Sequence, residues 1–225
     1  MIPKDKEGII LVNKPQGVTS HDVVDMVRRK LSMKRVGHAG TLDPLAEGLL
    51  VILVGKATKL FSKFVNFDKE YLGVLKLGEV TTTGDSQGEL VEKKEYADVD
   101  DEKLQKSFAS LIGDIKQVPP MVSALRKGGK RLYALARKGI TVEREPRDIK
   151  IYELKILKTE LPLVEFYVRC SKGTYVRALA EDIGKLLGCG AHIIKIRRLS
   201  IGFFKLDDAV NVEDIEEKHI RKFDL

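Results

Sequence analysis

The chain has 225 residues, which is enough for one large domain or two small ones with a buried core. Its hydrophobic fraction of 43% and charged fraction of 32% are those of a globular protein and exclude a disordered chain. Lys and Arg number 40 against 33 Asp and Glu, and the resulting net charge of +7 favours a polyanionic partner such as a nucleic acid.

The sequence carries no pattern of export or of metal binding. Residues 1–8 are charged and lack the apolar stretch of a secretory signal, and the apolar run Leu49–Val54 is too short to cross a bilayer. Cys170 and Cys189 have the spacing of neither a disulfide framework nor a metal site. The histidines also lack metal-ligand spacing: His21, His38, His192 and His219. We therefore expect a cytoplasmic protein with reduced cysteines, no metal and no membrane contact.

The first elements of the chain are a strand and a helix. Gly8–Asn13 is predicted as a short buried strand that ends at the turn Lys14–Gly17. Thr19 or Ser20 can cap a helix that runs to about Leu31. Its apolar residues recur at helical spacing and its basic residues gather in the last turn, as the helix dipole favours.

The remaining elements mix strands and helices without strict alternation. The patterns predict strands at 49–54, 71–77, 149–157, 163–170 and 191–204, and helices at 56–65, 101–111, 132–138 and 174–187. A turn-rich connection is expected at 82–88, and the tail from Asp207 is at most a short helix. This order predicts an α+β fold around one mixed, mostly antiparallel sheet.

Two nucleotide-binding motifs can be excluded. Gly55-Lys56 ends like a phosphate loop, but Leu50 stands where the first glycine belongs and Ala57 replaces the magnesium-binding Ser or Thr. Gly188–Gly190 begins like a dinucleotide fingerprint, but Ile193 stands where its third glycine belongs.

The segment 37–48 is the most informative part of the chain. It presents a single aspartate, Asp43, in a glycine-rich and mostly uncharged loop. Pro44 disfavours a helical conformation for Asp43, and the glycines allow a ligand or another backbone to approach closely. A carboxylate on such a pre-shaped turn is typical of a catalytic group and equally of a structural capping residue, so the loop alone leaves both roles open.

A second segment, 172–177, places Arg177 in the first turn of the helix that Thr174 would cap. A cation there opposes the helix dipole, which indicates an anionic partner elsewhere; a solvent-exposed arginine is the alternative. Tyr71 has the pattern of a packed strand aromatic, His38 that of a loop histidine, and the basic run Arg126–Arg131 that of a solvated hairpin tip.

Taken together, these segments resemble the TruB family of pseudouridine synthases, over roughly Ile9 to Phe204. Six motifs carry the resemblance: Lys14-Pro15 with Thr19–Asp22, Gly37–Gly48, Lys69–Tyr71, Pro119–Gly139, Lys172–Gly184 and Arg197–Phe203. The stretch 117–147 resembles the RNA-gripping insertion of the bacterial branch. We expect the pseudouridine synthase fold over residues 1–206, helices flanking its sheet, and a tail at 207–225 without the further RNA-binding (PUA) domain common in the family.

The resemblance implies a role for each site residue. Asp43 is the catalytic acid-base or nucleophilic group, Arg177 its counter-ion and Tyr71 the residue that stacks on the target base. Whether Asp43 attacks C1′, adds to the base at C6 or removes the 2′ proton stays open. Further residues are implied at or beneath the RNA-binding surface: Lys14, His38, Arg126, Lys127, Lys130, Arg131, Ile196, Arg197 and Arg198.

The implied function is conversion of uridine 55 in the T loop of tRNA into pseudouridine. The uridine must be flipped into a pocket, and the reaction is an isomerisation that needs no cofactor. The expected partner is the T-arm stem-loop of tRNA, not DNA, and the expected state is a monomer. Two alternatives remain: a non-catalytic RNA-binding or RNA-folding protein, and a synthase that acts on another RNA or needs a guide RNA.

Overall fold

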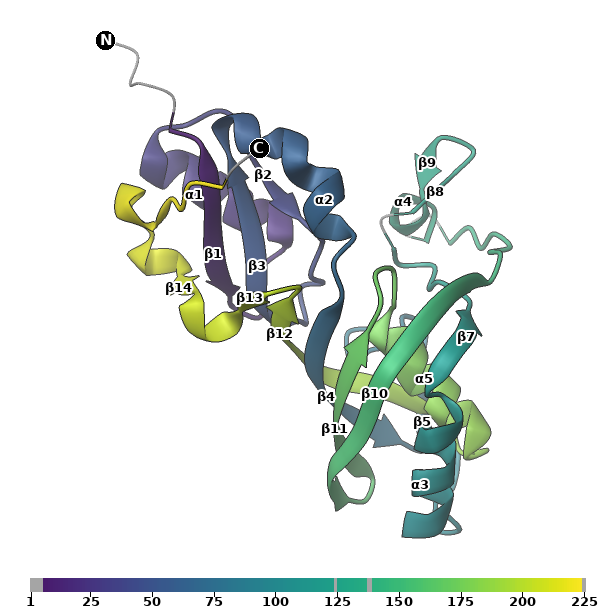
Figure 1. Ribbon diagram of the computed structural model, residues 1–225. Coiled ribbons are helices and arrows are strands. Elements are labelled where there is room, and N and C mark those ends of the chain that lie inside the picture. The colour runs from purple at the N-terminus through teal and green to yellow at the C-terminus, as the bar shows by residue number, and fades with distance from the viewer. Residues whose placement is uncertain (1–5, 124, 137–138, 224–225) are drawn as a thin grey trace. The chain divides into compact units, whose positions relative to one another are not determined.

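The computed structural model describes residues 6–123, 125–136 and 139–223 (Figure 1). The chain divides into two compact units, residues 1–71 with 197–225 and residues 72–196. Two strands, β4 (Lys69–Leu77) and β12 (Ala191–Ile201), each begin in one unit and end in the other. The predicted α+β class with a mixed, mostly antiparallel sheet is confirmed. Among the described residues, no helix is long and apolar enough to span a membrane.

The sheet of the first unit is built around β3 (Glu47–Val54). β1 (Gly8–Lys14) pairs with β3 antiparallel along one edge, with Ile10 opposite Ile52. The other edge of β3 holds β2 (Val36–Ala39) and the last part of β12, and β14 (Val210–Asn211) lies beyond β1 in the strand order β14-β1-β3-β12. The loop that carries Asp43 therefore leaves β2 and re-enters the sheet at the start of β3.

One face of this sheet is covered by α1 (Ser20–Leu31), as the sequence predicts. Thr19 caps the helix in a capping box with Asp22, and Ser32 ends it in a left-handed conformation. Its buried face packs against alternate residues of β1 and β3; the cluster includes Val23, Val24, Val27, Leu31, Ile10, Val12, Leu50 and Ile52. Full burial of one such side chain contributes about 1.5–3 kcal/mol, so this face fixes the register of the first unit.

The opposite face of the sheet packs on a segment predicted as one helix at 56–65, and that prediction is only partly right. The segment is a 3₁₀ helix η1 (Gly55–Leu60) followed by a short α2 (Phe61–Val65). The hydroxyl of Thr58 donates to the carbonyl of Gly55 (2.9 Å) and competes with the α-helical pattern. Phe64 is fully buried against the side chains of β1 and β3 that point away from α1.

The end of the chain also belongs to the first unit. β12 turns into β13 (Phe204–Lys205), and β14 (Val210–Asn211) pairs parallel to β1. Three 3₁₀ turns account for the helical part of the tail: Leu206–Asp208, Val212–Asp214 and Glu217–His219. The described tail residues, 207–223, therefore pack along β1 as part of the first unit.

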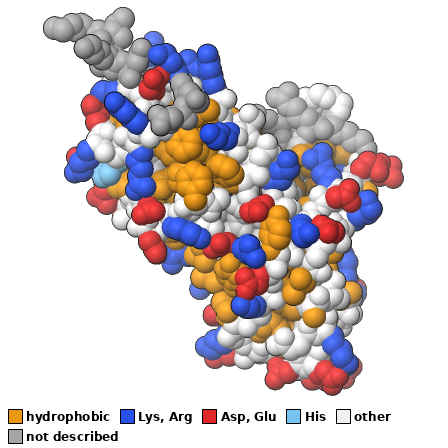
Figure 2. Space-filling view, viewed as in Figure 1, with side chains coloured by type: hydrophobic (Ala, Val, Ile, Leu, Met, Phe, Trp, Pro, Cys, Tyr) orange, Lys and Arg blue, Asp and Glu red, His pale blue; other side chains and the backbone are white. Residues whose placement is uncertain are grey.

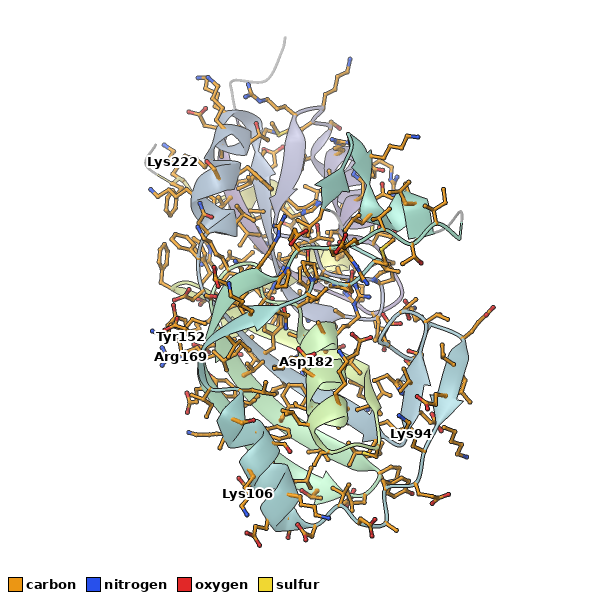
Figure 3. All side chains as sticks on the ribbon, turned by 90° about the vertical axis from the view of Figure 1, so that its right-hand side faces the viewer. Lys94, Lys106, Tyr152, Arg169, Asp182 and Lys222 are labelled. Atoms are coloured by element: carbon orange, nitrogen blue, oxygen red, sulfur yellow. The ribbon has the colours of Figure 1, made fainter. Side chains whose placement is uncertain are left out.

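The second unit is built on a long antiparallel pair, β10 (Arg147–Glu160) and β11 (Leu163–Cys170), in the order β4-β11-β10-β7. Across this pair, the Arg169 guanidinium lies 5.1 Å from the centre of the Tyr152 ring (Figure 3). The other elements are α3 (Asp101–Ser110), β7 (Gly113–Gln117), α5 (Val176–Leu186) and a small sheet of β5 (Glu79–Thr81) and β6 (Leu90–Lys93) that the sequence patterns did not predict.

The start of α5 corrects the predicted cap. The helix begins at Val176 with Tyr175 as its cap, and the hydroxyl of Thr174 donates instead to the carbonyl of Ser171 (3.0 Å). The side chain of Gln117, from β7, accepts from the Tyr175 amide (2.8 Å) and donates to its carbonyl (3.2 Å). The capping group of α5 is therefore the side chain of Gln117, on β7, and not a side chain from the residues just before the helix.

The predicted insertion contains a hairpin and a short helix. β8 (Arg126–Lys127) pairs with β9 (Lys130–Arg131) across a Gly-Gly turn, and α4 (Leu132–Ala136) follows. The amide of Leu132 donates to the carbonyl of Leu125 (2.8 Å), which closes the base of the hairpin. Residues 137–138 of the predicted helix lie outside the described residues.

Candidate active site

Asp43 lies in a short turn that its own backbone closes. The amide of Ala46 donates to the carbonyl of Asp43 (3.0 Å), which bends the chain at Pro44. The carbonyl of Pro44 in turn accepts from the amide of Gly17 (2.8 Å), in the turn after β1. The Asp43 side chain is half-buried. Its carboxylate is therefore presented on a loop that two hydrogen bonds hold in shape.

The start of α1 fixes the residue that precedes Asp43. The hydroxyl of Ser20 donates to the carbonyl of Leu42 (3.0 Å) and accepts from the amide of Leu42 (2.8 Å). Ser20 is the first residue of α1 and is buried. Because both polar groups of Leu42 bond to one hydroxyl on a packed helix, the backbone beside Asp43 has little freedom.

Arg198 supports the same loop from β12. Its guanidinium donates to the carbonyls of Leu49 (2.7 Å), Gly40 (3.2 Å) and Thr41 (3.4 Å). A side chain at Gly48 would place its Cβ 2.4 Å from the Arg198 carbonyl oxygen, so β3 and β12 approach closely only because Gly48 has none. Arg198 is only 1% exposed, and in this position it holds the loop from inside the unit.

Lys14 is a second buried cation close to the loop. It has no exposed surface, and its ammonium donates to the carbonyls of Pro15 (2.9 Å) and Val18 (2.7 Å). Burial lowers the pKa of Lys14 from 10.5 to about 8, against an opposing pull from the carboxylate of Asp43. The charges of Lys14 and Asp43 therefore interact within the first unit. Like Arg198, Lys14 is a buried cation that donates to backbone carbonyls near the Asp43 loop.

Arg177 is buried in the second unit and has the anionic partner that its position in the helix indicated. It is 2% exposed, donates to the carbonyls of Thr83 (2.8 Å) and Val122 (2.6 Å), and lies 3.6 Å from the carboxylate of Asp85. The alternative of a solvent-exposed arginine is therefore wrong.

Asp85 is a functional candidate that the sequence patterns did not reveal. Its carboxylate accepts from the Thr83 hydroxyl (2.6 Å) and the Gln87 amide (3.0 Å), so it is held rigidly toward Arg177. The only signal in the sequence is the Thr-Gly-Asp stretch within the connection 82–88, which predicts a turn and nothing more. A loop aspartate gives no sign in sequence of a partner about ninety residues away.

The other predicted residues occupy varied positions. Tyr71 is buried on β4, where the first segment of the first unit ends. His38 is half-buried on β2, and Ile196 is buried on β12. Arg197 is half-exposed and lies 3.7 Å from Glu47. Lys130 is exposed on β9, whereas the side chains of Arg126, Lys127 and Arg131 lie outside the described residues.

Each unit contains candidates that act on one another. In the first unit, Arg198 supports the loop that carries Asp43, and the charge of Asp43 acts on Lys14; in the second unit, Arg177 lies beside Asp85. The pairing of Asp43 with Arg177 involves residues of different units and stays a prediction. Within the described ranges, no three His, Cys, Asp or Glu side chains form a group that could hold a metal ion.

Comparison with known protein families gives two matches that together cover most of the chain. The family model "TruB family pseudouridylate synthase (N terminal domain)" matches residues 28–176. A second family model, "tRNA pseudouridylate synthase B C-terminal domain", matches residues 177–223.

Curated relatives are similar over almost the whole chain. A tRNA pseudouridine synthase B of Opitutus terrae is 46% identical over 213 residues, which cover 95% of this chain and 88% of that protein. A protein of the same name from Clostridium tetani is 46% identical over 216 residues, covering 96% of this chain and 75% of its own.

Solved structures are similar over the same range. A chain of a Cbf5-Nop10-Gar1 complex superposes with a TM-score of 0.72 at 31% identity, covering 92% of this chain and 53% of its own. An H/ACA RNP bound to a substrate RNA containing 2′-deoxyuridine gives a TM-score of 0.69 at 28% identity, covering 93% of this chain and 52% of its own. This chain spans about half the length of both solved chains.

Proposed function

This chain belongs to the TruB family of pseudouridylate synthases, and we propose that it converts uridine 55 in the T loop of tRNA into pseudouridine. The observation that carries the proposal is the Asp43 loop, which resembles the family's catalytic motif and is held by hydrogen bonds from Ser20, Gly17 and Arg198. The relatives named tRNA pseudouridine synthase B support tRNA as the substrate.

The proposed reaction is an isomerisation of the nucleoside. The N1–C1′ bond breaks, the uracil rotates, and a C5–C1′ bond forms while the proton on C5 is lost and N1 gains one. No atom is added or removed overall, so the chemistry requires no redox cofactor. A uridine stacked in a folded loop is inaccessible, and we propose that it is flipped out into the site before reaction.

Asp43 is the group proposed to act on the flipped nucleoside. Catalysis by a positioned carboxylate depends on its reach and orientation, and the fixed turn at Pro44 supplies both without reorganisation. Lys14 and Arg198 add positive charge close to the loop that carries this carboxylate.

Residues outside the Asp43 loop are proposed to complete the site. Arg177, oriented by Asp85, is the counter-ion of Asp43 during reaction. Tyr71 supplies the aromatic face against which the uracil stacks, and His38 lies beside the displaced nucleotide. The basic hairpin, with Lys130 exposed, is proposed to contact RNA phosphates.

The decisive experiment replaces Asp43 by asparagine and measures pseudouridine formation in a bare T-arm stem-loop. Asp43→Asn keeps the size and polarity of the side chain but removes its charge. We expect no detectable pseudouridine and unchanged RNA affinity, whereas the exposed-residue control Asp214→Asn should behave as the wild type. Normal product formation by Asp43→Asn would refute the catalytic assignment.

The same assay separates the rival functions. The purified chain alone, with no guide RNA or second protein, should modify the T-arm at position 55, and mapping of pseudouridine by position checks the site. RNA binding without product in the wild type would favour a non-catalytic RNA-binding protein, and product only with an added guide would favour a guide-dependent synthase. We further propose that the chain acts in the cytoplasm as a monomer.

A further inference from the structure

Phenylalanine is distributed very unevenly in this chain. Five of its eight phenylalanines form one set of ring contacts in the first unit, hereafter the phenylalanine cluster: Phe64, Phe67, Phe203, Phe204 and Phe223. Phe64 and Phe204 are buried, but Phe203 is 63% exposed. Figure 2 shows hydrophobic side chains gathered on this face of the first unit and bordered by Lys and Arg. An exposed patch of this kind marks a binding surface.

Phe203 is held in its exposed position by a rigid turn. Gly202 has a φ of 56°, its amide donates to the carbonyl of Asp68 (2.8 Å), and a Cβ on it would lie 2.9 Å from the Phe67 ring. The Phe203 ring is parallel to that of Phe223, with an interplanar angle of 6° and 6.3 Å between centroids. The exposed face is therefore preorganised, which limits the conformational entropy that a stacking partner would lose.

The phenylalanine cluster also carries lysines. The ammonium of Lys63 lies 4.9 Å from the centre of the Phe223 ring. Lys205 follows Phe204, and Lys222 (Figure 3) precedes Phe223; both are exposed. Of these three lysines, only Lys205 forms an ion pair with a carboxylate among the described residues, with Glu70 at 3.2 Å. The cluster thus combines an aromatic platform with positive charge, the two features of proteins that bind single-stranded nucleic acid.

We propose that the phenylalanine cluster docks an unpaired stretch of RNA, with a base stacked on Phe203 and neighbouring phosphates beside Lys63. Phenylalanine offers no hydrogen-bonding group, so the contact would tolerate any base. The inference rests on the proposed action on RNA and adds a second contact to it. Phe203 lies in the turn between β12 and β13, five residues beyond Arg198, so it is not part of the Asp43 loop.

The experiment measures binding of a fluorescent single-stranded oligouridylate by anisotropy at low salt. We expect Phe203→Ala to weaken binding about tenfold, in line with the loss of one stacked base. Phe203→Leu should weaken it equally because it keeps the apolar surface but not the aromatic face, and Phe203→Tyr should bind as the wild type. Leu157→Ala is the control, since Leu157 is 55% exposed on β10, in the other unit.

Charge is tested separately with Lys63→Gln. This variant should bind more weakly at low salt, and the slope of log affinity against log salt should fall by about one. Circular dichroism melting of every variant shows that it is folded, and Phe203→Leu retains enough apolar surface to serve if Phe203→Ala does not fold.

Two results would overturn the inference. Equal oligouridylate affinity for Phe203→Leu and wild type would exclude stacking. Concentration-dependent self-association that Phe203→Ala abolishes, with unchanged RNA binding, would assign the cluster to a second copy of the chain.

Parallel measurement of T-arm isomerisation separates this inference from the proposed function. Product formation with unchanged oligouridylate binding in all Phe203 variants contradicts only the docking surface. Phe203-dependent binding without any pseudouridine contradicts only the proposed function.

Discussion

Lys14 and Arg198 are two cations that the first unit buries near the Asp43 loop. Each is satisfied by backbone carbonyls, two for Lys14 and three for Arg198. Burial of a charge is costly unless such partners are present, so these carbonyls offset part of the cost of burying the two cations. The carboxylate of Asp43 raises the pKa of Lys14, whereas the guanidinium of Arg198 lowers it.

The lowered pKa of Lys14 predicts a pH dependence of stability. The pKa is about 8 in the folded chain against an ordinary value of 10.5 for the unfolded chain, so the unfolded chain binds more protons between these values. The free energy of unfolding should therefore rise with pH from about 8 to 10.5, by up to roughly 3 kcal/mol, and show no Lys14 contribution to the slope below pH 8.

Urea unfolding of wild type and Lys14→Met across this pH range tests the prediction. Lys14→Met keeps the length of the side chain but cannot titrate. The difference in unfolding free energy, wild type minus variant, should increase with pH over that window. Parallel pH profiles of the two proteins would show that Lys14 does not titrate abnormally.

The Arg177–Asp85 pair predicts a large loss of stability when one partner is neutralised. Both side chains are almost fully buried, at 3% and 6% exposure. Asp85→Asn removes the carboxylate that lies 3.6 Å from the buried guanidinium of Arg177 and should cost about 3 kcal/mol in urea unfolding. The control is Asp148→Asn, which breaks a surface pair with Lys116 and should change stability by less than about 1 kcal/mol. Equal effects of the two substitutions would contradict a structural role for Asp85.

At the scale of secondary structure, α5 depends on a cap from outside its own segment. Gln117 is 2% exposed and makes both of its bonds to the backbone of Tyr175. Gln117→Ala leaves these groups without that partner and should destabilise the chain by about 1–3 kcal/mol. Thermal or urea unfolding measures the effect, with Gln105→Ala, on the exposed side of α3, as the control. A negligible effect of Gln117→Ala would mean that solvent replaces the cap.

The elements that the sequence predicted are those whose signal is local. α1 has an apolar stripe, a capping box and a basic last turn within its own residues, and β1 is a continuous apolar run ended by Pro15. The predictions that were wrong concern residues whose hydrogen-bonding partners are distant in the sequence. Thr174 has the residue type of a cap, yet Gln117 takes that role from another strand.

The candidate site follows the same rule. Asp43 is recognisable because Pro44 and the glycines that shape its loop are its sequence neighbours. Asp85 is not recognisable from the sequence, because its role depends on its ion pair with Arg177, a residue of α5 that only the fold brings close. Side-chain burial also distinguishes roles that the sequence leaves open. Arg198 is expected at or beneath the RNA-binding surface, and its burial and three carbonyl partners place it inside the first unit.

At the scale of the whole molecule, the chain crosses between its two units within strands β4 and β12. The proposed catalytic residues are divided in the same way, with Asp43 in the first unit and Arg177 in the second. Each unit nevertheless holds its own residue rigidly through contacts of its own, Ser20 and Arg198 on one side and Asp85 on the other. Mutations of these supports should therefore affect stability and catalysis together.

The net charge of +7 predicts salt-dependent RNA binding, because phosphate contacts release counterions. The affinity of Asp43→Asn, which avoids turnover, for a T-arm stem-loop should fall linearly with salt on logarithmic axes. Adding Lys130→Gln, in the exposed hairpin, should lower the slope by about one. Lys106→Gln is the control, because Lys106 (Figure 3) is also exposed but pairs with Glu102 on α3. An unchanged slope for Lys130→Gln, or an equal change for Lys106→Gln, would place the phosphate contacts elsewhere on the chain.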